Sequence, residues 1–289
     1  MVGLLLAFTA VGCGGGTDAP AGMDADTTPE PDGGAPDADE GGVTLSHCPG
    51  SADGVHGPDL TRVRWSDGIA FCIDATEVTN AQYSEFLAAK PAAGTQSARC
   101  TWNQSFTPAT KSTNGPACPP FDAAARKDHP VVCVDWCDAD AYCRWAGKRL
   151  CQTPGGGTVK NWTGKNASEW VIACTADAAR NYPYGTAPEM GRCVDRAYPS
   201  TTPGLQPVKA AAMCEGGVPG LFDASGNAWE WQDDCAEQST DGRGDACSPL
   251  GGSFSSETPN AACISGAPFF REQVAGDTGF RCCADALFF

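Results

Sequence analysis

The sequence predicts an α+β domain that is rich in loops, with short helices, small antiparallel sheets and multiple disulfides. Seventeen cysteines occur in 289 residues, at irregular spacing and with three histidines, which favours a disulfide framework in an oxidising compartment over zinc sites. Capping signals precede short helical stretches. Short apolar segments are separated by long polar stretches, which predicts short strands joined by irregular loops.

Three short helices are predicted from their first residues. Ser, Thr, Asp or Asn at the N-cap, with Glu or Gln three residues later, satisfies backbone N–H groups at a helix start. A following Gly or Pro ends the helix. These signals place helices over 80–89 after Thr79, over 136–146 after Asp135, and from a capping box at Asn166 and Glu169 to Cys174.

Apolar segments at 71–74, 129–134 and 278–283 are predicted as strands. Cys282 and Cys283 are neighbours on the last of these. Successive side chains on a strand point to opposite faces of the sheet, so these two cysteines should have different partners.

The N-terminal residues predict a lipoprotein leader. Residues 2–12 are apolar and end at Cys13; this run is too short to span a bilayer but fits the hydrophobic region of a signal peptide. Residues 10–13 resemble a bacterial lipobox. Residues 1–13 are therefore predicted to be a signal peptide with lipidation at Cys13, which implies membrane attachment through a lipid anchor. An ordinary buried strand is the alternative.

Residues 14–45 are predicted to be a disordered acidic tether, and 46–289 to be the globular domain. The tether contains eight acidic residues and no Lys or Arg, which is half of the formal net charge of −16. Its Gly, Ala, Asp and Pro content cannot bury enough surface to offset chain entropy. Neither part suits a polyanion, so nucleic acid is not expected as a partner.

The cysteine count agrees with this division. Without Cys13 the chain has sixteen cysteines, enough for eight bridges. Cys100 and Cys118 lie in a loop-like segment with few other ordering elements, so a local bridge is expected between them. Cys193 and Cys214 are further candidates for bridges.

A family resemblance rests on five motifs in order. Residues 220–231 read Gly-Leu-Phe-Asp-Ala-Ser-Gly-Asn-Ala-Trp-Glu-Trp, a turn followed by buried aromatics. With segments 77–80, 130–150, 251–254 and 278–283, this string resembles the formylglycine-generating enzyme (sulfatase-modifying factor) family. The resemblance implies a C-type-lectin-like fold in a single domain, with short helices, small sheets and much irregular backbone.

The resemblance also implies where a catalytic copper would be held. Catalytic members of the family oxidise a substrate cysteine to formylglycine, with copper(I) on two cysteines after the Gly-Gly-Ser-aromatic motif. The equivalent positions here are Ser256 and Ala261, and Cys263 lies nearby. A hydroxyl and a methyl cannot replace two thiolates for copper(I), and Cys263 is expected to be in a bridge. We therefore expect copper chemistry to be absent.

A structural calcium site is a second implication of the resemblance. The family's ligands correspond to the side chains of Asp223 and Glu230 and to the carbonyls of Gly226 and Ala228, all oxygen donors suited to calcium. The alternative is that Asp223 and Glu230 cap turns or accept backbone N–H bonds.

By analogy with the family, the candidate groove residues are Trp229, Ser253, Ser256 and Arg281. Most tryptophans are expected in the core, and a buried, ion-paired Arg281 is the alternative for that residue. The hypothesis is a monomeric, lipid-anchored protein of the bacterial cell envelope, on the outer membrane and facing the periplasm or the surface, that binds peptide or glycan. An active formylglycine-generating oxidase is the first alternative, and a structural surface module is another.

Overall fold

A computed structural model describes residues 46–65, 68–159, 168–266 and 269–288. The predicted leader and tether, with Cys13, lie outside the described residues, as does Asn166. The described residues belong to one compact unit. Within that part of the chain, no helix has the length and hydrophobicity to cross a bilayer.

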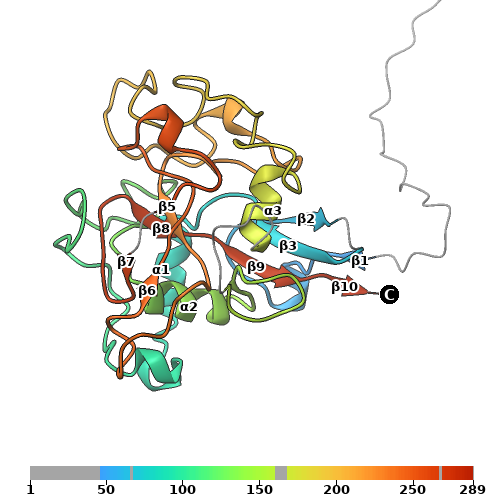
Figure 1. Cartoon of the computed structure of the whole chain (residues 1–289). Helices are drawn as coiled ribbons and strands as arrows, with labels where there is room; N and C mark the ends of the chain where they lie inside the picture. The colour runs from blue at the N-terminus through green and yellow to red at the C-terminus, as the bar shows by residue number, and fades with distance from the viewer. Residues whose placement is uncertain (1–45, 66–67, 160–167, 267–268, 289) are drawn as a thin grey trace, which may run out of the picture. The chain divides into compact units, whose positions relative to one another are not determined.

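The largest sheet has four strands in the order β2-β3-β9-β4. All neighbours are antiparallel, and the predicted strand 71–74 forms most of β3. The central position of β9 joins the C-terminal part of the chain to the N-terminal half (Figure 1). The strands are β2 (Leu60–Arg64), β3 (Ala70–Asp74), β4 (Arg149–Leu150) and β9 (Cys282–Asp285).

Three further sheets are pairs of short strands. They are β1 (Ser46–His47) with β10 (Leu287–Phe288), β5 (Trp229–Trp231) with β8 (Thr278–Phe280), and β6 (Ala246–Cys247) with β7 (Phe269–Phe270). The β5–β8 pair is parallel, which corrects the expectation of antiparallel sheets throughout. The long segment between these two strands provides the crossover that a parallel pair requires.

Two of the predicted helices are confirmed, α1 (Asn80–Ala88) and α2 (Trp136–Trp145). Thr79 caps α1 by accepting from Gln82 N, and Asp135 caps α2 by accepting from Asp138 N. The short 3-10 helices are Ser51–Asp53, Ala93–Thr95, Ala98–Cys100, Ala212–Cys214 and Thr258–Asn260.

Helix α3 (Glu169–Thr175) begins later than predicted. Ser168 is its N-cap and accepts from Val171 N at 3.1 Å, so the capping box at Asn166 and Glu169 is wrong. The Glu169 carboxylate is held instead by Arg149 at 2.8 Å and by Gln152 N at 3.0 Å. A distant cation therefore decides the role of this side chain.

The predicted strand 129–134 is also wrong. Val131 N donates to Val78 O and Cys133 N donates to Ala275 O, on two different segments, so no continuous ladder forms. Cys133 has a φ of 62°, outside the range of a strand. The predicted strand 278–283 is present as two short strands, β8 and β9, separated by Arg281. β8 pairs with β5, and β9 pairs with β3.

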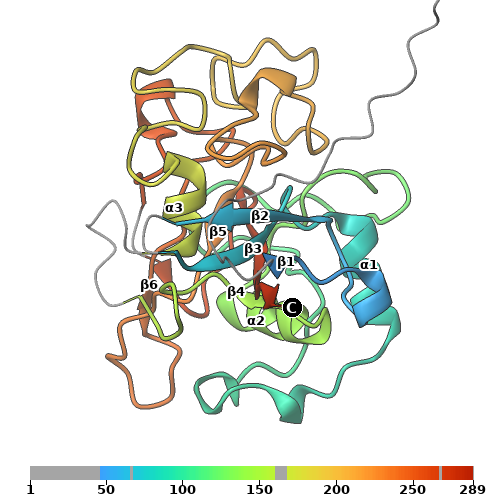
Figure 2. The ribbon, with the colours of Figure 1, turned by 90° about the vertical axis from the view of Figure 1, so that its right-hand side faces the viewer.

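Two clusters form most of the apolar core. One packs the rings of Tyr83, Phe86, Tyr142 and Phe280 between α1, α2 and β8, in tilted, stacked and edge-to-face pairs with centroid distances of 5.3 to 5.6 Å. The other packs α3 against β3, which lies beside it in both views (Figures 1 and 2). Trp170 is the largest side chain of this second cluster.

Eight disulfides join these elements, and all sixteen cysteines of the described residues take part. Cys282 and Cys283 have different partners, as predicted, and the Cys193–Cys214 bridge is present. The expected Cys100–Cys118 bridge is wrong, because Cys100 packs on α2 and Cys118 lies beside the turned backbone of Cys133. The pairs are 48–72, 100–137, 118–133, 143–282, 151–283, 174–263, 193–214 and 235–247.

Candidate functional site

The turn within residues 220–231 has a tightly specified backbone. Asp223, Gly226 and Asn227 have positive φ values of 57°, 76° and 56°. A Cβ on Gly226 would lie 2.4 Å from Val194 O, so this close approach requires glycine. Asn227 N donates to Val194 O at 2.7 Å and its Oδ1 accepts from Gln206 N at 3.0 Å. The turn therefore fixes two neighbouring loops.

Glu230, at the end of this turn, forms a buried ion pair with Arg281. Arg281 Nε and Nη2 donate to the two carboxylate oxygens at 2.6 and 2.7 Å, and Trp170 Nε1 donates to Oε2 at 2.6 Å. The guanidinium also donates to Phe222 O and Asp74 O. Burial acts to lower the pKa of Arg281, but the charge of Glu230 outweighs it and the pKa rises.

Two more carboxyl groups lie near this pair. Asp223 Oδ2 accepts from Lys209 N at 2.6 Å, while its Oδ1 and both oxygens of Glu77 are buried without a hydrogen-bond partner. Burial raises the pKa of Asp223 to about 6 and the pKa of Glu77 well above its usual value, with Asp223 and Glu230 adding repulsion at Glu77. Burial and the neighbouring carboxylates thus both favour the protonated form of Glu77.

These contacts test the predicted calcium donors. The unpartnered Oδ1 of Asp223 suits a cation, but both oxygens of Glu230 already accept from Arg281 and Trp170. A calcium ion on Glu230 would have to displace a guanidinium that neutralises the same carboxylate. The four-donor set, with the carbonyls of Gly226 and Ala228, therefore does not fit the arrangement of these side chains.

The positions equivalent to the copper ligands carry no sulfur. Ser256 Oγ accepts from Ser253 N at 3.0 Å. Ala261 is buried, its carbonyl accepts from the Ser225 hydroxyl, and a Cβ on Gly252 would lie 2.6 Å from its Cα.

Cys263, the nearby cysteine, is fully buried in a bridge with Cys174. The donors at these positions therefore do not fit copper(I), which requires soft ligands.

A two-part groove lies beside these positions. Its first hollow has a volume of about 670 Å³ and its second of about 390 Å³. Both are lined by Phe254 and by segment 202–204, so the two hollows share a wall. Ser255, the residue after Phe254, lines the second hollow and donates to Asp277 at 2.8 Å.

None of the four predicted groove residues lines this groove. Ser253 and Arg281 are fully buried, Ser253 donating to Asp277 at 2.8 Å. Trp229 and Ser256 are half-buried, and neither is among the residues that line the two hollows. Phe254, the aromatic residue of the Gly-Gly-Ser-aromatic motif, is the part of that motif that lines the groove.

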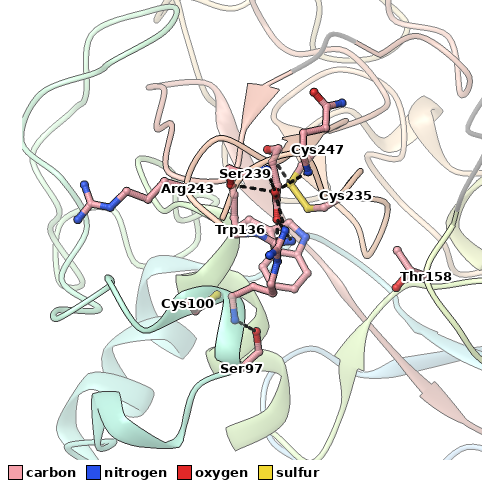
Figure 3. A network of polar contacts seen from close by, with 12 residues as sticks. Ser97, Cys100, Trp136, Thr158, Cys235, Ser239, Arg243 and Cys247 are labelled. Atoms are coloured by element: carbon pink, nitrogen blue, oxygen red, sulfur yellow. Dashed lines mark hydrogen bonds and ion pairs between the residues drawn. A yellow bond between two sulfur atoms is a disulfide. The ribbon is translucent and has the colours of Figure 1, made fainter. Parts of the chain in front are cut away.

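A polar network elsewhere lies beside a third hollow of about 420 Å³, which Arg99, Trp136 and Arg271 help to line. Asp245 accepts from Arg99 at 2.7 Å, from Arg271 at 3.2 Å and from Ser239 Oγ at 3.0 Å, and the guanidinium of Arg271 lies 4.1 Å from the Trp136 ring. Figure 3 shows Trp136 and Ser239 in this network, next to the Cys235–Cys247 bridge.

Burial acts against the charge of Asp245, but hydrogen bonds from the backbone N–H groups of Ser239 and Gln238, and then from the Ser239 hydroxyl and Arg99, lower its pKa to about 2. The carboxylate joins three loops, which is a structural role.

Comparisons with known proteins show the family of this chain. Residues 61–286 match the Sulfatase-modifying factor enzyme 1-like domain. The formylglycine-generating enzyme of Bos taurus is 29% identical over 184 residues, covering 56% of this chain and 46% of that protein. An inactive C-alpha-formylglycine-generating enzyme 2 of Mus musculus is 30% identical over 125 residues, covering 40% and 35%. The chain thus spans about half the length of the curated relatives it matches, or less.

A solved structure gives the same result for the fold. PvdO from Pseudomonas aeruginosa superposes with a TM-score of 0.53 at 17% identity, covering 75% of this chain and 81% of that one. The family predicted from five short motifs is confirmed: the chain belongs to the family of the Sulfatase-modifying factor enzyme 1-like domain, the formylglycine-generating enzyme family.

Proposed function

We propose that this protein is a non-catalytic member of its family that binds peptide or glycan in the groove at Phe254. The observation that carries the proposal is the buried Cys174–Cys263 bridge, because it takes up the cysteine nearest to the copper positions. Ser256 and Ala261 supply no sulfur. Without two thiolates the family's oxidation of a cysteine has no site for copper(I).

The groove has features of a ligand-binding site. Its larger hollow, of about 670 Å³, lies within the usual range for such sites, roughly 300–1,000 Å³. Its walls combine an aromatic ring and prolines with the polar side chains of Ser255 and Gln206. The mouse relative is named as inactive, which supports the idea that this family contains members that keep the domain without the activity.

Binding arrays test the proposal. Peptide and glycan arrays probed with the wild-type protein should give a defined set of ligands. Phe254→Ala should lose them while the protein stays folded by far-UV circular dichroism, with a lower melting temperature because Phe254 also packs against two apolar clusters. Ile264→Ala is a matched control, because Ile264 is exposed and lines neither hollow. Ligands that survive Phe254→Ala would place binding elsewhere, and no ligands at all would favour a structural surface module.

An active formylglycine-generating oxidase is the second candidate. It would need the Cys174–Cys263 bridge to open, which would release two thiols near the copper positions. Both cysteines are fully buried, which opposes such opening. Conversion of a cysteine peptide to an aldehyde by the purified protein would support the oxidase.

The location belongs to the same proposal. Lipidation at Cys13 would hold a monomeric, C-type-lectin-like domain at the cell envelope, with the acidic tether as a spacer. Cys13→Ser should release the protein into the soluble fraction, and continued membrane association would contradict the lipid anchor.

A further inference from the structure

We propose that the groove selects ligands in which an anionic group is attached to an apolar body, with Arg126 as the residue that binds the anion. This inference depends on the proposed function, because it specifies which peptide or glycan chemistry the Phe254 groove accepts. It rests on the charges that line the larger hollow and on how the segment that supplies them is held.

The charge in the larger hollow is positive. Among the described residues that line it, Arg126 and His129 are the ionisable ones, and none is a carboxylate. In a chain with a formal net charge of −16, a cationic wall with no carboxylate among its described lining residues is unusual. An uncompensated guanidinium at the edge of an apolar hollow favours an anion, and can hold a carboxylate, sulfate or phosphate through two parallel hydrogen bonds.

Arg126 differs from the other groove arginine. Arg196, in the smaller hollow, is paired with Glu257 at 2.6 Å. Asp195, also there, accepts from Thr258 Oγ1 at 2.6 Å and from Ala197 N at 2.9 Å. Among the described residues, no carboxylate lies within ion-pair distance of Arg126. The positive charge available to a ligand is therefore at the larger hollow.

The backbone that carries Arg126 is held in place. Asn80 Nδ2, at the start of α1, donates to Arg126 O at 3.0 Å and to His129 O at 3.1 Å. His129 N donates to Arg126 O at 3.0 Å, and Val208 N, next to the opposite wall, donates to Asp128 O at 2.8 Å. The turn is thus fixed to both a helix and the groove wall, which lowers the ordering cost of binding.

His129 contributes a polar group without adding to the charge. Its imidazole is partly buried, and burial together with the charge of Arg126 lowers its pKa, with Asp128 opposing. At neutral pH the ring is therefore neutral and can donate or accept one hydrogen bond. The guanidinium of Arg126 supplies the net charge at this end of the groove.

The rest of the larger hollow suits an apolar body. Its apolar wall consists of Ala117, Pro119, Pro203, Leu205, Pro207 and Phe254. Proline side chains have little rotamer entropy to lose when a ligand covers them. A ligand such as a peptide with an aromatic or aliphatic residue beside a carboxylate satisfies both the wall and the guanidinium.

Two dyes with the same apolar body but different charge test this selectivity. 8-Anilinonaphthalene-1-sulfonate carries a sulfonate, and N-phenyl-1-naphthylamine lacks it. Both are titrated by fluorescence into the folded full-length protein. Phe254→Ala should weaken both dyes. Arg126→Gln should weaken the sulfonate dye about tenfold or more, as expected for a lost hydrogen bond to a charged group, and change the neutral dye less than about twofold.

Two variants separate the role of Arg126 from general charge and folding effects. Lys127→Gln removes a neighbouring exposed charge that is paired with Asp128, and it should leave both dyes unchanged. Arg126→Lys should restore most of the sulfonate affinity.

An equal loss of affinity for both dyes in Arg126→Gln, or no loss for either, overturns the inference while leaving the groove as a binding site. If neither dye binds wild type, or Phe254→Ala has no effect, the proposed function fails as well.

Discussion

Arg281 and Glu230 form a fully buried ion pair, with two hydrogen bonds of 2.6 and 2.7 Å between the guanidinium and the carboxylate. Arg281 lies where β8 ends and β9 begins, and Glu230 lies in β5. The pair therefore connects the parallel β5–β8 sheet to the four-stranded sheet. The same guanidinium donates to Phe222 O and so also holds the turn before β5.

Breaking this pair should destabilise the domain strongly. Glu230→Gln leaves a guanidinium buried without its counter-charge, and such changes cost about 3–5 kcal/mol. Urea unfolding of wild type and variant measures the difference. Glu257→Gln, which removes the partner of the exposed Arg196, is the control and should cost less than about 1 kcal/mol. Equal losses in both variants would contradict the structural role of the buried pair.

The Cys174–Cys263 bridge should contribute measurably to stability. It joins α3 to the segment after the Gly-Gly-Ser-Phe motif, across 89 residues. Removing a native disulfide typically costs about 2–5 kcal/mol, so the Cys174→Ala/Cys263→Ala protein should unfold at clearly lower urea concentration. Full reduction of all bridges should unfold the domain. A far-UV circular dichroism spectrum that stays native in excess reductant would show that the bridges are dispensable.

Stability should fall as the pH rises from about 4 to about 8. Burial raises the pKa of Asp223 to about 6 and the pKa of Asp234 to about 8, compared with about 3.9 in an unfolded chain. Between these values the folded state binds more protons than the unfolded state, so its free energy of unfolding decreases with increasing pH. The pKa of Asp245 is lowered instead, so its carboxylate stabilises the folded state, and this stabilisation is lost as the pH falls through about 2.

Melting curves at intervals from pH 4 to pH 9 measure this dependence. Asp234→Asn mimics the protonated group and should reduce the slope across the interval from about pH 4 to about pH 8. A melting temperature that rises steadily with pH across this range would contradict the assigned directions of the pKa shifts.

Calcium should have little effect on the melting temperature. An ion at one hundred times its dissociation constant stabilises the folded state by about 2.7 kcal/mol, which a melting curve detects easily. Because Glu230 is occupied by Arg281, we expect no such shift at millimolar calcium relative to chelator. A calcium-dependent increase that Asp223→Asn abolishes would instead show that Asp223 binds the ion, as the family resemblance implies.

Local signals in the sequence predicted the elements that local contacts determine. The caps of α1 and α2 involve residues three positions apart, so Thr79 and Asp135 identified both helices. The predicted start of α3 was wrong because Arg149, in β4, binds the Glu169 carboxylate. The strand at 129–134 was wrong because Cys133 turns the backbone to reach Cys118.

Sequence motifs contain some residues of the candidate site, and distant segments supply the others. The Gly-Gly-Ser-Phe motif contains Phe254, which lines the groove, and the motif spacing gave Ser256 and Ala261, which do not line it. Arg126 and His129 have no local signal, because Asn80 and Val208 position their turn from other parts of the chain. The pairing of Glu230 with Arg281 likewise depends on strands that are far apart in sequence.

The central claim is that this domain has no thiolate pair for copper(I), and an anaerobic copper(I) titration tests it most directly. Full-length Cys13→Ser protein, with its bridges intact, is titrated against a chromogenic copper(I) chelator. A Ser256→Cys/Ala261→Cys variant serves as the comparison because it restores both sulfurs. We predict that the Cys13→Ser protein withdraws no copper from the chelator. Stoichiometric binding by that protein, together with conversion of a cysteine peptide to an aldehyde, would contradict the account.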